Sequence, residues 1–219
     1  MSDKFLPSIG SAALVFLAAC QSAPETATKG TPTVGVTEVS APVLATPTAV
    51  PDSVVLRRFV PAGYRILDTA TGDLNRDAYP DKLLALDSVP TDPEAFGSEA
   101  LRPLLVLLGN AQGDYRLAAR NDHAVLCGGC GGVMGDPYQG LTIKNGYFSL
   151  EHYGGSGWRW TRIITFRHDP ATRRWWLHRV GGETFHSASP DSAQSYMHTA
   201  RDFGRVSFEQ FTGDEGAGE

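Results

Sequence analysis

Residues 141–150, LTIKNGYFSL, contain the clearest structural signal in the chain. Apolar and polar residues alternate on both sides of Asn145-Gly146, as they do in strands with one buried face. Asn and Gly both tolerate the positive φ of a type I′ turn, so the pair predicts a two-residue β-hairpin. In that register Ile143 opposes Phe148, which places apolar side chains on the same face.

Other segments carry strand signals as well. Residues 82–86 and 104–108 are nearly continuous apolar runs, which are typical of strands covered on both faces. Residues 158–166 and 173–178 predict a second hairpin across Asp169-Pro170. The two-residue period places five side chains of its first strand on one face: Trp158, Trp160, Arg162, Ile164 and Phe166.

Helical signals are weak throughout the chain. We expect a last strand at residues 205–211 and at most a short helix within residues 191–199. The fold class that follows is all-β: a mainly antiparallel, sandwich-like arrangement, not a complete propeller, with few or no helices beyond the signal peptide.

The N-terminus has the pattern of an export signal. Lys4 precedes residues 6–19, an apolar stretch shorter than the ~20 residues that a spanning helix needs. It ends in LAAC at residues 17–20, which resembles the lipobox of bacterial lipoproteins and implies cleavage before Cys20 and acylation of that residue. Gln21 follows, instead of the Asp that retains such proteins in the inner membrane, so we expect the outer membrane, facing the periplasm. The alternative is an ordinary secretory signal with a chance cysteine.

These signals divide the chain into four parts. Residues 1–19 are the signal peptide, and residues 20–53 are the lipidated cysteine with a Thr-, Ala- and Pro-rich tether that lacks aromatic residues. Residues 54–212 form the β-rich envelope domain, and residues 213–219 form a frayed tail.

The charge balance argues against nucleic acid as a partner. Lys and Arg number 19 against 24 Asp and Glu, a net charge of −5, and no basic cluster is present. Scattered arginines are expected on a solvated sheet face: Arg159, Arg162, Arg167, Arg173 and Arg174.

Residues 72–81, GDLNRDAYPD, form the sharpest local motif. Oxygen-bearing side chains recur at alternate positions of a short turn, which suits calcium because this hard cation takes several oxygen ligands at once. Leu84 stands where an EF-hand carries its bidentate Glu, so the motif is not an EF-hand. The predicted ligands are the side chains of Asp73, Asn75, Asp77 and Asp81 and the carbonyl of Tyr79.

The loop resembles the calcium loop of FG-GAP and VCBS-type repeats, the blades of integrin-like β-propellers. The likeness covers residues 64–117, one repeat, and implies a structural calcium ion. Ala78 stands where these repeats usually have a glycine in the left-handed conformation. One repeat cannot close a propeller, which needs at least about four blades. The chain as a whole resembles small bacterial lipoproteins.

Cys127 and Cys130 enclose two glycines. In an oxidising compartment this pair predicts a disulfide that pins a glycine-rich turn. A redox-active site is an alternative, although it requires a helix N-terminus after a strand. A metal site is a second alternative, although no further cysteine pair is available.

Four tryptophans are concentrated between residues 158 and 176. We expect most of their area in the core, although half-exposed tryptophans also bind sugars and partner proteins. Trp175 and Trp176 are adjacent in sequence and therefore point to opposite faces of a strand. The candidate binding platform consists of Trp158, Trp160, Trp175 and Trp176.

Together these patterns predict a lipid-anchored envelope protein with a structural calcium loop, acting as a binding or structural module; whether it is also an enzyme is left open. Its expected partners are the membrane, through the lipid alone, and a glycan or another envelope protein. Two alternatives remain open. One is a periplasmic hydrolase or thiol oxidoreductase whose site forms only in three dimensions, and the other is a docking subunit of an envelope complex.

Overall fold

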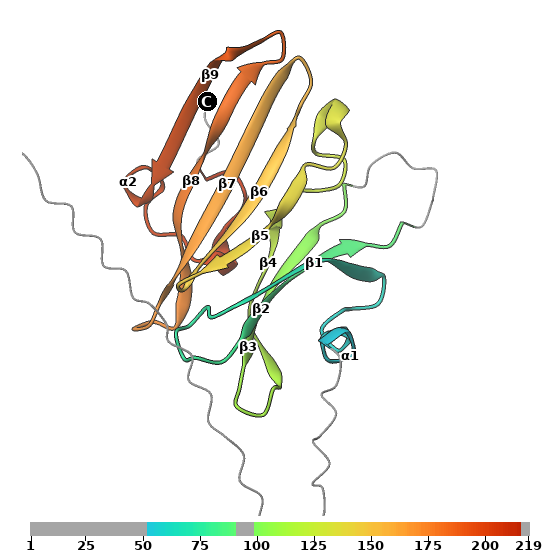
Figure 1. The fold of residues 1–219 in the computed structure, drawn as a ribbon, viewed down its shortest axis with the longest axis vertical. Helices are drawn as coiled ribbons and strands as arrows, with labels where there is room; N and C mark the ends of the chain where they lie inside the picture. Colours follow the sequence, from blue (N-terminus) through green and yellow to red (C-terminus); the bar gives the residue numbers. More distant parts are fainter. Residues whose placement is uncertain (1–51, 91–98, 216–219) are drawn as a thin grey trace, which may run out of the picture. The chain divides into compact units, whose positions relative to one another are not determined.

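The structure, a computed structural model, describes residues 52–90 and 99–215. These residues form two antiparallel sheets, coloured cyan to green and yellow to red in Figure 1. The first contains β1 (Tyr64–Gly72), β2 (Asp81–Ser88), β3 (Arg102–Gly109) and β4 (Tyr115–Val125). The second contains β5 (Tyr138–Lys144), β6 (Tyr147–Gly155), β7 (Trp158–Asp169), β8 (Arg174–His186) and β9 (Ser189–Thr199).

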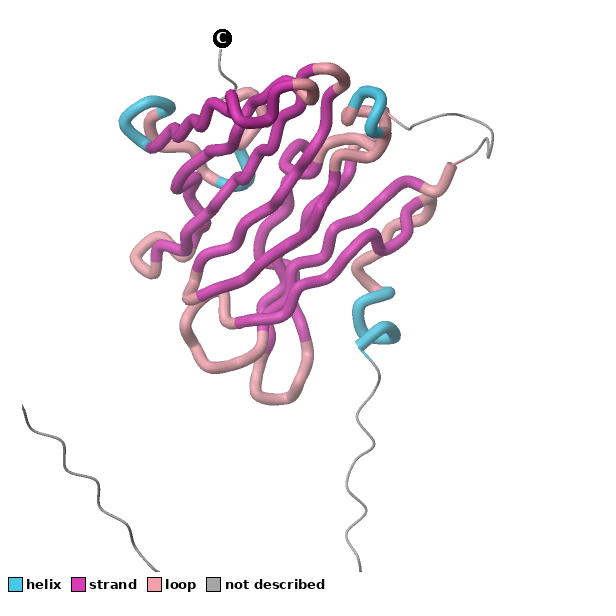
Figure 2. Tube along the Cα trace, turned by 45° about the horizontal axis from the view of Figure 1, so that its top comes forward, coloured by secondary structure: helices cyan, strands magenta, loops and turns pink. Residues whose placement is uncertain are grey.

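Each sheet is a meander in which strands that are consecutive in sequence are hydrogen-bonded neighbours. Helical structure within the described residues is short, as Figure 2 shows. It comprises α1 (Asp52–Arg57), α2 (Ala200–Phe203) and the single 3₁₀ turns η1 (Gly132–Met134) and η2 (Phe208–Gln210). The predicted all-β fold is confirmed, and the described strands close neither a barrel nor a propeller.

The β5–β6 hairpin has the predicted register. Ile143 lies opposite Phe148, and Asn145 and Gly146 turn the chain at φ values of 53° and 77°. Both values are positive, as a type I′ turn requires. Phe148 then enters the core, where its ring stacks on Phe166 of β7 at 5.1 Å between centroids.

One continuous apolar core lies between the two sheets. The first sheet contributes residues such as Leu83 and Val106, and the second contributes Ile164 and Trp175. Since a single cluster contains side chains from both meanders, the two sheets pack face to face as a sandwich.

Strands β2 and β3 are buried on both faces, as their apolar runs predict. A second cluster on the outer face joins Leu84 and Leu105 to Leu56 of α1 and to Phe59. The segment leading into β1 therefore covers the first sheet from outside. This burial explains why these two strands show no polar alternation in sequence.

Two local predictions near the C-terminus were wrong. Residues 191–199 form part of β9, an exposed strand paired with β8, and not a helix. Residues 205–211 make only one bridge, between Ser207 and Trp176, before the η2 turn. The segment packs across the open side of the core, where Phe208 and Phe211 are buried.

Asn121 of β4 fastens this C-terminal segment. Its Nδ2 donates to the carbonyls of Phe208 and Phe211, both at 2.7 Å. Its Oδ1 accepts from the N–H groups of His123 and Ala124 at 2.8 and 2.6 Å. All four hydrogen-bonding positions of the buried amide are thus used within the chain.

We expect Asn121→Ala to lower the free energy of unfolding by about 3 kcal/mol or more, because each backbone group that loses its partner while buried costs about 1–3 kcal/mol. Chemical denaturation measures the change. Asn110→Ala is the matched control, since Asn110 also accepts two backbone N–H bonds but lies in an exposed turn. Equal losses in the two variants would contradict the role of Asn121.

Candidate functional site

The β1–β2 connection holds the predicted calcium ligands in one turn. Asp73 Oδ1 accepts from the N–H of Arg76 at 2.5 Å. Asn75 Oδ1 accepts from the N–H of Asp77, and Asp77 Oδ1 accepts from that of Tyr79, both at 3.0 Å. These bonds fold the three side chains back over the backbone of the loop.

Two residues of this loop adopt left-handed backbone conformations. Arg76 has a φ of 66° and Ala78 a φ of 70°. Ala78 is the position at which the resembling repeats usually place glycine. The left-handed conformation is therefore present there without glycine, at a cost of about 1–2 kcal/mol.

The loop is attached to both sheets. The guanidinium of Arg76 donates to the carbonyl of Asn145 at 3.0 Å, and the N–H of Gly146 donates to the carbonyl of Asp73 at 3.2 Å. The turn of the first sheet thus rests on the β5–β6 turn of the second.

Asp81 lies at the base of the loop and is completely buried. Its two carboxylate oxygens accept from the N–H groups of Leu74 and Gly109 at 2.8 and 2.9 Å. Burial raises the pKa of Asp81, the two N–H bonds oppose that rise, and the charge of Asp77 adds to it. An ionised Asp81 is therefore held at a free-energy cost that a nearby cation would reduce.

The loop has the oxygen donors that calcium requires, but their side chains are not arranged as a complete coordination site. Within the described ranges, no three His, Cys, Asp or Glu side chains are grouped so as to hold a metal. Asn75 Nδ2 donates to Asp77 Oδ2 at 2.6 Å, so these two side chains already meet. Asp73, Asp77 and Asp81 form no ion pair in the described part of the chain.

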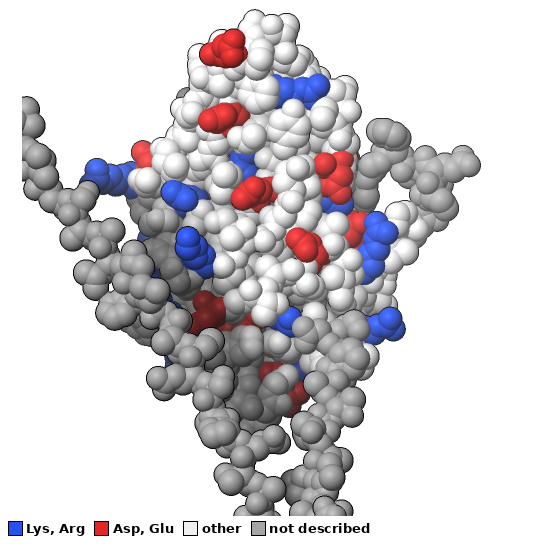
Figure 3. All heavy atoms as spheres, in the orientation of Figure 1, with Lys and Arg blue, Asp and Glu red and all other residues white. Residues whose placement is uncertain are grey.

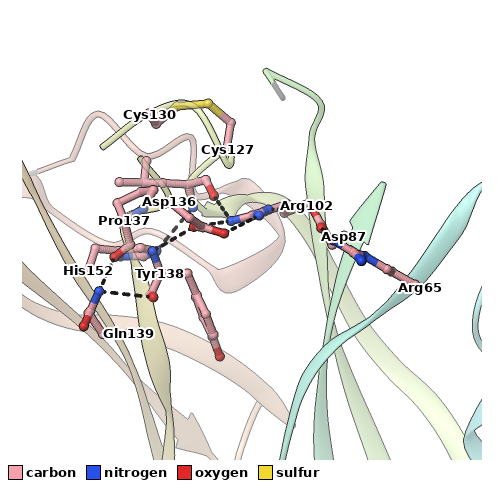
Figure 4. A network of polar contacts seen from close by, with 11 residues as sticks. Arg65, Asp87, Arg102, Cys127, Cys130, Asp136, Pro137, Tyr138, Gln139 and His152 are labelled. Carbon is pink, nitrogen blue, oxygen red and sulfur yellow. Dashed lines mark hydrogen bonds and ion pairs between the residues drawn. A yellow bond between two sulfur atoms is a disulfide. The ribbon is translucent and has the colours of Figure 1, made fainter. Parts of the chain in front are cut away.

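A buried ionic network lies at the other end of the first sheet, where β3 begins (Figure 4). The guanidinium of Arg102, whose side chain is 4% exposed, contacts Asp87 at 2.9 Å and Asp136 at 2.7 Å. It also donates to the carbonyl of Leu126 at 3.2 Å. Arg102 thereby fixes the β4–β5 connection against the first sheet.

The cysteine pair lies in this connection. Cys127 and Cys130 form a disulfide that closes a four-residue loop. The N–H of Gly155 donates to the carbonyl of Gly131 at 3.0 Å and joins the loop to β6. Gly154 has no room for a side chain, because a Cβ would lie 2.5 Å from the Trp160 ring. A glycine-rich loop therefore packs closely on β6, consistent with a structural role.

His152 of β6 is buried behind the ionic network. Its Nε2 accepts from the N–H of Leu126 at 3.3 Å, and its Nδ1 has no hydrogen-bond partner. Burial lowers the pKa of His152 from 6.5 to about 4, the charges of Arg162 and Arg102 contribute to the fall, and Asp136 opposes it.

A pocket of about 580 Å³ opens beside this network. Arg162 of β7, the disulfide and the C-terminal residues Thr212–Asp214 contribute to its walls. The prediction that the arginines lie on a solvated sheet face is wrong for Arg162. This residue shares its face of β7 with the core residue Ile164. The two-residue period of β7 in the sequence already placed Arg162 on the same face as Ile164.

The tail expected from residue 213 is held in place at its start. Arg162 Nη2 donates to the carbonyls of Gly213 and Glu215 at 2.6 and 3.0 Å. Sequence analysis did not find this contact, since no local pattern pairs β7 with residues about fifty positions later.

The tryptophans do not form one platform. Trp175 is buried in the core, and Trp176 lies under Arg205 with 3.9 Å between the guanidinium carbon and the ring centroid. Trp160 packs on Gly154. Trp158 is 65% exposed beside His186 and is the one of the four that is largely open to solvent.

Charge is mixed over the face of the domain shown in Figure 3, where acidic and basic side chains are interspersed. No helix within residues 52–90 and 99–215 is long and apolar enough to cross a bilayer. Cys20 and the tether to residue 51 lie outside the described residues.

Comparison with known proteins gives no match to a family model, a curated protein or a solved structure. The likeness of residues 64–117 to a calcium repeat therefore depends on the motif itself, and the function must be argued from the geometry.

We expect the free energy of unfolding to fall as the pH is lowered from 6.5 towards 4. In that range the unfolded chain binds a proton at His152 and the folded chain does not. The contribution of His152 to the free energy of unfolding is therefore fully present above pH 6.5 and is lost as the pH falls towards 4. The pKa difference corresponds to about 3 kcal/mol.

Denaturation curves across this range should show a weaker pH dependence in His152→Gln, whose amide oxygen can also accept from the N–H of Leu126. His123→Gln is the control, since His123 is exposed. An unchanged pH profile in His152→Gln would show that His152 already takes up its proton in the folded state.

Proposed function

We propose that this chain is a lipid-anchored protein of the cell envelope, and that its β-sandwich is a binding or structural module stabilised by calcium in the β1–β2 loop. The anchor would be Cys20, with the domain held away from the membrane by the tether that follows. The alternating oxygen donors, in a loop whose carboxylates form no ion pair in the described part of the chain, are the main support for the calcium site.

Three features of the loop favour a cation. Asp73, Asp77 and Asp81 lie within nine residues and have no ion-pair partner in the described part of the chain. The conformation of Ala78 is the one that such loops use. Asp81 is buried beside the charge of Asp77, and a divalent cation would offset their repulsion.

The proposed ligands are the carboxylates of Asp73, Asp77 and Asp81, the amide oxygen of Asn75 and the carbonyl of Tyr79. Calcium bound by these ligands would neutralise the negative charge of the loop. It would also link the start of β2 to the residues that follow β1. Because the loop rests on the β5–β6 turn, this would stabilise the contact between the two sheets.

Calcium should raise the melting temperature of the purified chain by about 5–10 °C over a sample with chelator. Calcium at a hundred times its dissociation constant contributes about 2.7 kcal/mol, and each kcal/mol shifts a domain of this size by about 2–4 °C. Asp77→Asn should abolish the rise, and Asp191→Asn, an exposed carboxylate in β9, should retain it. Identical melting curves with calcium and with chelator would exclude the calcium site.

Cys20→Ser should move the protein from the membrane pellet to the supernatant after cell fractionation, because the acyl chains that supply membrane affinity are lost. Incorporation of labelled palmitate should disappear in the same variant. Replacing Ser22, two positions later, by Ala should change neither result. A Cys20→Ser protein that stays in the pellet would contradict the lipid anchor.

A further inference from the structure

Arg162 is a largely buried cation on which the charges of Glu215 and Asp214 act without a direct ion-pair contact. It forms no ion pair in the described part of the chain, although guanidinium groups withdrawn from water are normally paired. Its Nη2 is bound to two backbone carbonyls, and its Nε is buried without a partner. Its Nη1 makes no hydrogen bond to a described residue and is not among the buried unpartnered atoms, and Arg162 lines the pocket.

The walls of the pocket divide into charged and apolar parts. Leu101, Val125 and Leu126 supply an apolar surface beside the disulfide. Glu99 and Asp214 also line the pocket, are exposed, and form no ion pair in the described ranges. One unpaired cation, two unpaired carboxylates and an apolar wall therefore meet in one cavity.

This combination selects for a particular ligand chemistry. A purely anionic ligand would be repelled by the two carboxylates, and a purely cationic one would leave Arg162 unpaired. A molecule that carries a negative group, a positive group and an apolar side chain complements Arg162, the two carboxylates and the apolar surface. The volume of about 580 Å³ lies within the range of about 300–1,000 Å³ for sites that bind small molecules.

We infer that this pocket binds short peptides or amino acids with apolar side chains, with the ligand carboxylate on Arg162 and its ammonium group on Glu99 and Asp214. Leu101 and Leu126 contact the apolar side chain. The site is separate from the β1–β2 loop and does not depend on calcium. It would supply the module with a ligand.

Two parts of the pocket wall are held by hydrogen bonds within the chain. Arg162 is held by the carbonyls of Gly213 and Glu215, and the Glu215 carboxylate in turn accepts from the N–H groups of Thr212 and Gly213. Another part of the wall is positioned by Arg102, which binds the carbonyl of Leu126. These two parts of the wall are already in place before a ligand enters, which favours affinity.

Calorimetric titration of the purified chain with the dipeptides Leu-Leu, Val-Ala and Phe-Gly tests the proposal. At least one should bind saturably, and its C-terminally amidated form should bind at least about tenfold more weakly, which corresponds to about 1.4 kcal/mol. Arg162→Gln should bind the free dipeptide as weakly as the original chain binds the amidated one. The variant should therefore no longer distinguish the free from the amidated peptide. Arg174→Gln is the control, since Arg174 is exposed in β8.

A second variant guards against misfolding of Arg162→Gln. Glu99→Gln combined with Asp214→Asn changes only exposed side chains, and it should weaken binding of the free dipeptide but not of its N-acetylated form. Absence of saturable binding by all three dipeptides at millimolar concentration would overturn the proposal. Equal affinity of the original chain and the folded variants would overturn it as well.

Discussion

The fold depends on two carboxylates buried at opposite ends of one strand. On the inner face of β2, Asp81 and Asp87 flank the apolar residues Leu83 and Ala85. A carboxylate withdrawn from water must be hydrogen-bonded or paired, so each end requires a fixed partner. Asp81 accepts hydrogen bonds from backbone N–H groups of the β1–β2 loop and of the end of β3. Asp87 forms an ion pair with Arg102. The placement of the loop and of the β4–β5 connection follows from these requirements.

The parts of the fold that could be predicted are those encoded locally. Asn145-Gly146 sets both the turn and the register of its hairpin, and the apolar run of β3 already indicates two covered faces. Residues 205–211 alternate like a strand, yet their carbonyls are bound by Asn121, more than eighty positions earlier, and no local pattern contains that contact. The exposed strand β9 is held mainly by backbone pairing with β8, which side-chain composition does not reveal.

The candidate sites show the same division. The spacing of Asp73, Asn75 and Asp77 is a local pattern, and the structure places all three in one turn with hydrogen bonds back to its backbone. The pocket around Arg162 joins β7, the disulfide loop and the C-terminal segment, which are distant in sequence. Only the period of β7 indicated that Arg162 faces inward, and the lack of an ion-pair partner could be seen only in three dimensions.

The position of the C-terminal segment also determines when the domain can close during synthesis. Each meander is made of neighbours in sequence and can form as soon as its own strands have emerged. Phe208 and Phe211, however, fill the core between the sheets, and they are made only after the strands of both meanders. Until they arrive, the inner faces of both sheets are incompletely covered, so a truncated or stalled chain exposes apolar surface and is prone to aggregate. Synthesis of residues 208–211 is therefore the step that turns two sheets into one sandwich.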